Sequence, residues 1–270
     1  ISFQPSELAK WSMVFGLAAV CARSEPHARR YWTWFVPLCG LIGLVCGLIV
    51  VEDFGTAAFV ALISFVILMI AGVRWWHMLT LVPFAGAGVV AGLLRSPHRI
   101  KRLLAFLQPE KWPDIVYQAN QSLIAIGSGG VWGKGLGEGI SKYGHLPEDT
   151  TDFVFAVVGE ELGMVGTIGV IGLFVLFICL SWVVVMRCRD RFGRLLAAGI
   201  VLTIGIQAAL NIGVVTVVLP TKGIPLPFIS SGGTSMLLSA AAVGVLLNIA
   251  SQTDQGDPES PADTGDDMHA

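Results

Sequence analysis

The chain is built from long runs of apolar residues separated by short polar segments. Because about 17 to 25 consecutive apolar residues cross a bilayer as a helix, this pattern predicts about seven membrane spans. The expected spans are residues 6–22, 34–51, 54–72, 78–94, 153–185, 195–219 and 228–250. The fold class that follows is all-α, a polytopic transmembrane helix bundle whose membrane domain covers residues 1–250.

Composition agrees with an integral membrane protein. Hydrophobic residues make up 54% of the sequence and charged residues only 13%, whereas an ordinary soluble domain has about 25% charged residues. The stretch from Asp254 to Asp267 holds six acidic residues and no basic one, which predicts a disordered acidic cytoplasmic tail over residues 251–270. The sequence shows no basic patch typical of nucleic-acid binding. Its five cysteines lack the spacing of a disulfide framework or a metal site.

The arginines between the spans give an orientation. Arg23, Arg74 and Arg187 follow the first, third and fifth expected spans, so they fall on one side if the spans alternate. The positive-inside rule makes that side cytoplasmic. The segment 95–152 is then a large extracytoplasmic loop, and the loop 221–231 also faces outward.

The loop 95–152 holds seven basic residues, which the positive-inside rule does not favour on the outer side. Long loops often escape the rule, so these residues are either a tolerated feature of a long loop or a set of cations that meets an anionic ligand. Arg99 and Arg102 stand beside the apolar residues of 103–107. This pattern predicts a short helix lying in the membrane interface.

The polar stretch LPEDTTDF, residues 146–153, runs directly into an apolar span. An ionisable residue at the start of a membrane helix, such as Asp152, is energetically costly unless it has a function or a partner. Asp152 can cap the helix that starts at Phe153, or it can be a catalytic carboxylate at the outer surface. Glu160 and Glu161 follow about 12 Å deeper in a continuous helix, which predicts a polar cavity below the loop.

Three further charged residues allow two interpretations each. Glu7 and Lys10 share one helix face, either as an anchor at the membrane edge or as part of a functional site. Asp53 stands in an outward turn, where a solvated carboxylate is also tolerated. A structural hypothesis is that Glu7 and Lys10 pair with the acids around Glu160 and so shape the cavity.

Two loops are rich in glycine or proline. Residues 118–139, QANQSLIAIGSGGVWGKGLGEG, lack the context of a phosphate-binding loop, so we expect tight backbone packing over a substrate groove instead. Residues 219–236, LPTKGIPLPFISSGGTSM, predict a loop that re-enters the bilayer, which is acceptable only where protein or water covers its backbone. Lys222 within it is a candidate ligand for a phosphate.

With these motifs the chain resembles the SEDS family (shape, elongation, division and sporulation proteins), the polytopic peptidoglycan glycosyltransferases. The likeness covers nearly everything except the tail, and its motifs stand in family order. They include FQPSELAK at 3–10, DFGT at 53–56, LPEDTTDFVFAVVGEELG at 146–163 and NIGVVTVVLPTKGIPLPFISSGGTSML at 211–237. Family members have ten spans, so the resemblance implies that about three N-terminal spans are absent here.

Within the family, VVGEELG and LPTKG are closer to the division members than to the elongation members. The chain departs from the family pattern at two places. Asp149 and Thr150 stand where the family commonly has Ala and His, and Glu52 stands in the place of a proline. Asp152, which resembles the catalytic aspartate of the family, is present.

The resemblance implies polymerisation of lipid II at the outer leaflet, with inversion at the sugar carbon. Asp152 would be the general base. A divalent cation, Mg²⁺ or Mn²⁺, held near Glu148 and Asp152 would help to neutralise the leaving group. The cations expected to stabilise the leaving pyrophosphate are Arg99, Arg102, Lys142 and Lys222.

The family also suggests partners, namely a class B penicillin-binding protein transpeptidase and other division proteins. Two other classes of function remain open. Buried carboxylates and a broken loop also suit a transporter, here a lipid II flippase. A scaffold that only docks a transpeptidase is the other class, and an elongation polymerase is the alternative within the family.

Overall fold

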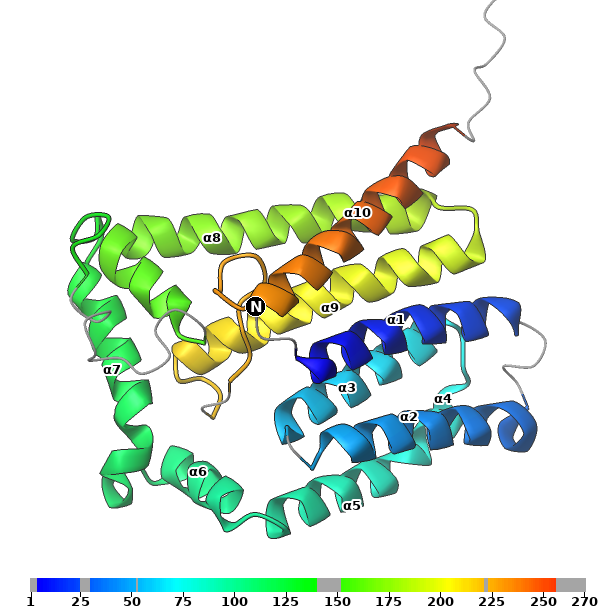
Figure 1. Ribbon diagram of the computed structural model, residues 1–270, viewed down its shortest axis with the longest axis horizontal. Helices are drawn as coiled ribbons and strands as arrows, with labels where there is room; N and C mark the ends of the chain where they lie inside the picture. Colours follow the sequence, from blue (N-terminus) through cyan, green and yellow to red (C-terminus); the bar gives the residue numbers. More distant parts are fainter. Residues whose placement is uncertain (1–3, 25–29, 52, 140–151, 221–222, 256–270) are drawn as a thin grey trace, which may run out of the picture.

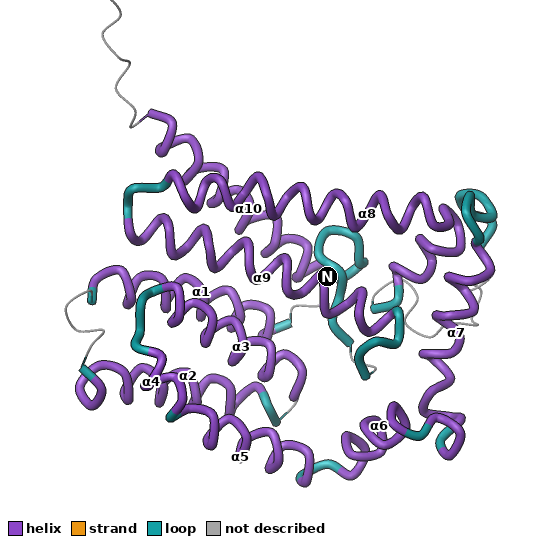
Figure 2. The backbone as a smooth tube through the Cα atoms, turned by 180° about the vertical axis from the view of Figure 1, so that it is seen from behind, coloured by secondary structure: helices purple, strands orange, loops and turns teal. Residues whose placement is uncertain are grey.

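The computed structural model describes residues 4–24, 30–51, 53–139, 152–220 and 223–255, and the regular structure of these residues is helical throughout (Figures 1 and 2). The predicted all-α fold is therefore confirmed. The elements are α1 (Pro5–Arg23), η1 (Tyr31–Phe35), α2 (Val36–Ile49), α3 (Phe54–Ile70), α4 (Trp75–Leu79), α5 (Leu81–Leu94), α6 (Pro97–Leu107), η2 (Pro109–Lys111), α7 (Pro113–Gly129), α8 (Val154–Arg187), α9 (Arg191–Val215) and α10 (Gly233–Gln255).

Within the described residues, five helical stretches are long and apolar enough to cross a membrane. They are Tyr31–Ile49, Trp75–Leu94, Val154–Arg187, Arg191–Val215 and Gly233–Thr253. The expected span 54–72 is α3, a shorter apolar helix. The expected span 6–22 is α1, which is a helix of 19 residues but carries buried Glu7 and Lys10. All seven apolar runs thus form helices.

Helix α9 is the centre of the bundle. It packs against α1, α3, α8 and α10, and residues on all its faces are buried, as expected for a helix that is apolar all round. Gly199 allows the close approach, because a Cβ there would lie 2.8 Å from Val14 Cγ1 and 3.3 Å from Ile67 Cδ1. Small residues let membrane helices pack closely in this way. The core therefore joins α1, α3 and α9 into one body.

The expected loop 95–152 is largely helical where the structure describes it. The amphipathic helix predicted around residues 103–107 is α6. Helix α7 was missed, although Pro113 and Asp114 in its first turn and a left-handed Gly130 after its end are ordinary start and stop signals. Figure 1 shows α7 lying across one end of the bundle, roughly at right angles to α8 and α9.

Helix α8 is broken at Gly163, which has φ 64° and ψ −158°. Residues 154–162 form a short arm and residues 164–187 a long helix, and the two meet at a sharp bend beside the end of α7 (Figure 1). The break comes after Glu160 and Glu161, so these two residues end the short arm and do not continue into the long helix. Both residues lie at the bend, at the same end of the molecule as α7.

The bend is held by residues 130–139, here called the strap. A broken helix leaves carbonyl groups unpaired at the end of its first part and amide groups unpaired at the start of its second part. The strap pairs with both sets. The bonds run from the amides of Lys134 and Gly135 to the carbonyls of Glu160 and Glu161 (both 3.0 Å), and from the amides of Met164 and Val165 to the carbonyls of Gly130 and Val131 (2.9 and 3.2 Å).

Two glycines make this contact possible. A Cβ at Gly163 would lie 2.4 Å from the Gly133 nitrogen, and a Cβ at Gly133 would lie 2.1 Å from the Glu161 carbonyl oxygen. Both residues also have positive φ, which L side chains rarely adopt. The glycine-rich run does pack tightly, but against the bend of α8, and the substrate groove expected below it stays a prediction.

Candidate functional site

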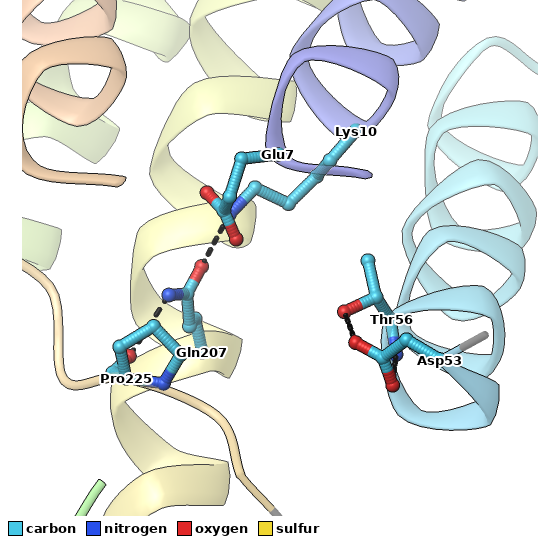
Figure 3. A network of polar contacts seen from close by, with 6 residues as sticks. All are labelled: Glu7, Lys10, Asp53, Thr56, Gln207 and Pro225. Atoms are coloured by element: carbon cyan, nitrogen blue, oxygen red, sulfur yellow. Dashed lines mark hydrogen bonds and ion pairs between the residues drawn. The ribbon is translucent and has the colours of Figure 1, made fainter. Parts of the chain in front are cut away.

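A small polar cavity of about 20 Å³, with room for about one water molecule, lies between α1, α3, α9 and the loop that precedes α10. Figure 3 shows its side chains, with Lys10 and Gln207 on one side and Asp53 and Thr56 on the other. The arginines that end α1 and α8 and begin α9 stand at the opposite end of these helices, so by the positive-inside rule the cavity faces outward. The lining residues are Gln4, Glu7, Lys10, Asp53, Thr56, Phe59, Gln207, Gly223, Ile224 and Pro225.

Lys10 is the buried cation of this cavity, with only 2% of its surface exposed. Its ammonium donates to Glu7 Oε2 at 2.7 Å and to Gln207 Oε1 at 2.8 Å (Figure 3). A buried charge is tolerable when it is paired in this way. An ammonium has three N–H donors, so the pairing still allows Lys10 to donate one bond to a ligand in the cavity.

Helix α9 holds the loop that lines the cavity. Gln207 and Asn211 stand one turn apart on α9, and their amide groups donate to the carbonyls of Pro225 (2.9 Å) and Ile224 (2.7 Å). Ser230 Oγ accepts the amide of Leu226 at 2.7 Å. Irregular backbone at membrane depth requires such partners. The predicted re-entrant loop therefore has its backbone covered by protein, as its sequence requires.

Asp152 lies directly against this loop. A Cβ on Gly223 would lie 2.5 Å from Asp152 Oδ2, so the carboxylate lies directly against Gly223. Asn211 also donates to the main-chain carbonyl of Asp152 at 2.7 Å. Gly223 itself lines the cavity, so Asp152 stands at its rim.

That Asp152 only caps α8 stays an alternative prediction. The cap position is occupied by Phe153, and Asp152 stands one residue before it. Asp53 shows what a capping aspartate looks like in this protein. Its Oδ1 accepts the amides of Gly55 (2.7 Å) and Thr56 (3.1 Å), and its Oδ2 accepts the Thr56 hydroxyl. Asp53 therefore starts α3 and forms a wall of the cavity.

Glu160 and Glu161 belong to the strap, not to the cavity of Lys10. The buried Glu160 accepts a bond from Lys134 Nζ at 2.7 Å, and Glu161 accepts the Gly137 amide at 3.0 Å. The hypothesis that Lys10 pairs with Glu160 is therefore wrong, because Lys10 is paired with Glu7 and Gln207.

The expected cations of the outer side have different surroundings. The guanidinium of Arg99 donates to the carbonyls of Gly92 (2.9 Å) and Val50 (3.2 Å), so it supports the ends of α5 and α2 and does not line the cavity. Arg102 lines a separate groove. Lys142, Glu148 and Lys222 lie outside the described residues.

Gln207 was missed from the sequence, and Asn211 was noted only as part of a polar run. Two amide side chains four residues apart in an apolar helix were the available signal, because they point to one helix face that needs hydrogen-bond partners. The hydrogen-bond partners of these two amides could not be predicted from the sequence, since Gln207 and Lys10 are 197 residues apart. Among the described residues, no group of three or more acidic, histidine or cysteine side chains gathers as a metal site.

The sequence matches the model of the FtsW/RodA/SpoVE family of cell cycle proteins over residues 1–255. It is 40% identical over 261 residues to a probable peptidoglycan glycosyltransferase FtsW of Coxiella burnetii (strain RSA 493 / Nine Mile phase I), covering 94% of this chain and 70% of that protein. Stage V sporulation protein E of Bacillus subtilis (strain 168) is 38% identical over 255 residues, with 92% and 68% covered.

Solved structures show the same likeness. A chain from a peptidoglycan synthase complex that coordinates polymerization and crosslinking superposes with a TM-score of 0.72 at 27% identity, covering 94% of this chain and 72% of that one. The rod shape determining protein RodA of Thermus thermophilus gives a TM-score of 0.63 at 28% identity, with 94% and 67% covered. The family expected from the motifs is thus confirmed: this chain belongs to the SEDS family, the FtsW-like peptidoglycan glycosyltransferases that are multi-pass proteins of the cytoplasmic membrane.

Proposed function

We propose that the protein polymerises lipid II into glycan strands at the outer face of the membrane, with Asp152 as the general base. The observation that carries the proposal is the position of Asp152, whose carboxylate lies against Gly223 at the rim of an outward cavity that contains a buried lysine. The similar protein of Coxiella burnetii is named a probable peptidoglycan glycosyltransferase, which supports the reaction class. A positioned carboxylate that acts as a general base raises the rate of such reactions by about 10²–10⁴-fold.

The reaction follows from this arrangement. The 4-hydroxyl of one lipid-linked disaccharide attacks the anomeric carbon of another and gives its proton to Asp152. The bond from that carbon to the pyrophosphate breaks, its electron pair leaves with the pyrophosphate, and the configuration at the carbon inverts. Lys10 supplies a cation to a cavity that Glu7 and Asp53 also line, while Lys142 and Lys222 remain proposed ligands of the leaving group.

A divalent cation held by Asp152 and Glu148 is a further proposal from the sequence. Carboxylate and phosphate oxygens are the ligands that Mg²⁺ and Mn²⁺ prefer, so Asp152 is a suitable donor. The ion would supply positive charge for the leaving pyrophosphate. The roles of Asp152 and Lys10 given above require no step through the ion.

We further propose that the biological setting is cell division, with a class B penicillin-binding protein as the partner. The FtsW names of relatives at 37 and 40% identity support the setting. The similar chain from a complex that coordinates polymerization and crosslinking supports a transpeptidase partner. An elongation role would instead require the protein to replace a RodA in cells, so complementation of FtsW- and RodA-depleted strains distinguishes the two roles.

Purified protein in liposomes with labelled lipid II tests the activity against the flippase alternative. We expect glycan strands, seen as a ladder after gel electrophoresis. Relocation of lipid II across the bilayer without strands would instead support a transporter.

A further inference from the structure

A second cavity lies apart from the Lys10 cavity, between α6 and α7 and above the end of α9. It is an open groove with a cavity volume of about 140 Å³. Its walls come from both surface helices and its floor from the turn that follows α9. The lining residues are Arg102, Ala105, Phe106, Pro109, Ile115, Val116, Ala119, Asn120, Val217 and Leu219.

The walls of this groove have the chemistry of an amphiphile site. Most lining side chains are hydrocarbon, and the buried Ala105 and Ala119 are too small to fill the space between the helices. Arg102 is the only charged residue among the lining residues, and a guanidinium can hold a phosphate through two N–H groups. A hydrocarbon chain with an anionic phosphate head matches both features.

The position of α6 would let such a ligand enter the groove from the membrane. Leu103, Leu104 and Leu107 are 40, 41 and 66% exposed, whereas Ala105 faces inward. An amphipathic helix with exposed leucines and basic residues lies at the boundary between headgroups and acyl chains. The groove beside α6 therefore opens at the level of the lipid headgroups.

The floor of the groove is strained. Val217 has φ 58°, which is a genuine outlier for a β-branched residue. Two bonds hold this turn in place, from the amides of Val218 and Leu219 to the carbonyl of Gly213 (both 2.9 Å). Ser122 on α7 also donates to the carbonyl of Val215 at 2.9 Å. Strained residues that the surrounding structure holds firmly cluster at ligand sites.

The groove is close to the proposed base. Leu219 on its floor is four residues from Gly223, so their Cα atoms are at most about 14 Å apart. Gly223 in turn contacts Asp152. We propose that this groove holds the prenyl chain of a lipid-linked sugar substrate, with the pyrophosphate of that lipid on Arg102. This inference rests on the proposed function and assigns the site of its lipid.

Photolabelling tests the inference without requiring turnover. The probe is farnesyl pyrophosphate with a diazirine on its chain, added to the protein in phosphatidylcholine nanodiscs. We expect label on peptides from 97–129 and 213–219, and competition by undecaprenyl pyrophosphate but not by inorganic pyrophosphate or phosphatidylglycerol. Equal competition by phosphatidylglycerol would overturn the prenyl assignment in favour of a general lipid groove.

Matched variants separate the contact with Arg102 from a general charge effect. Arg102→Gln should lower labelling about fivefold or more, because a hydrogen bond to a charged group is lost. Lys101→Gln removes the same charge from the same helix but should change labelling less than about twofold. The ammonium of Lys101 lies 5.9 Å from the Trp112 ring centre, and Lys101 does not line the groove. Equal effects of the two variants would contradict the inference.

The labelling result and the polymerisation result test the two proposals separately. If Asp152→Asn abolishes strands while the label lies elsewhere, the groove assignment fails and the polymerase proposal stands. If the groove is labelled but the unmodified protein makes no strands, the polymerase proposal fails and the lipid site stands. Ala119→Leu, which fills the groove from the other wall, should lower labelling too, with the melting temperature as its folding control.

Discussion

Two ion pairs of the protein have different surroundings, one buried on both sides and one with a partly exposed lysine. Lys10 and Glu7 are three residues apart on α1, and both line a cavity. Lys134 and Glu160 are 26 residues apart and lie where the strap closes on the bend of α8. The first pair faces a small polar cavity, whereas the second lies against the backbone of the strap, with the Lys134 side chain partly exposed to water. A buried charge pair is thus evidence of function only when a cavity lies beside it.

The largest effect is expected at the Lys10 pair. Lys10→Met leaves Glu7 as an uncompensated buried charge, which should lower the free energy of unfolding by about 3 kcal/mol and abolish polymerisation. The double variant Glu7→Gln, Lys10→Met removes both charges. It should regain most of the stability, measured by thermal unfolding in detergent, but not the activity. Recovered polymerisation would show that the pair is only structural.

The bend of α8 is tested by Gly163→Ala. The new Cβ would overlap the strap, and positive φ is unfavourable for alanine, so we expect a loss of about 2 kcal/mol in stability. Gly169→Ala is the matched control, because it lies in the same helix with nothing within 4 Å of its Cβ position. Equal melting temperatures for both variants would show that the strap does not hold the bend.

A smaller effect is expected at Lys134. Its side chain is 31% exposed, so water screens the pair, and Lys134→Met should cost about 1 kcal/mol with a modest loss of polymerisation. The double variant Lys134→Met, Glu160→Gln should recover both stability and activity, unlike the double variant of Lys10 and Glu7. If its activity stays low, the strap pair contributes to catalysis and the contrast between the two regions fails.

The sequence was sufficient for the helices, because long apolar runs carry that information directly. The outward position of Asp152 stays a prediction from the unequal arginine counts. The sequence also indicated that the loop around Gly223 needs covered backbone. The bend of α8 was not predictable, since a glycine within an apolar run is ordinary in membrane helices and its partners lie some 30 residues earlier. The role of Gln207 was hidden for the same reason, because its contact to Lys10 exists only in the folded chain.

The central claim is that Asp152 takes the proton during strand formation. The most direct measurement is the initial rate of lipid II polymerisation by Asp152→Asn in liposomes, together with lipid II binding. Glu138→Gln, which changes an exposed acid of the strap, is the control. We predict a rate at least about 100-fold lower for Asp152→Asn with binding retained, and an unchanged rate for Glu138→Gln. Polymerisation by Asp152→Asn at a near-normal rate would contradict the account.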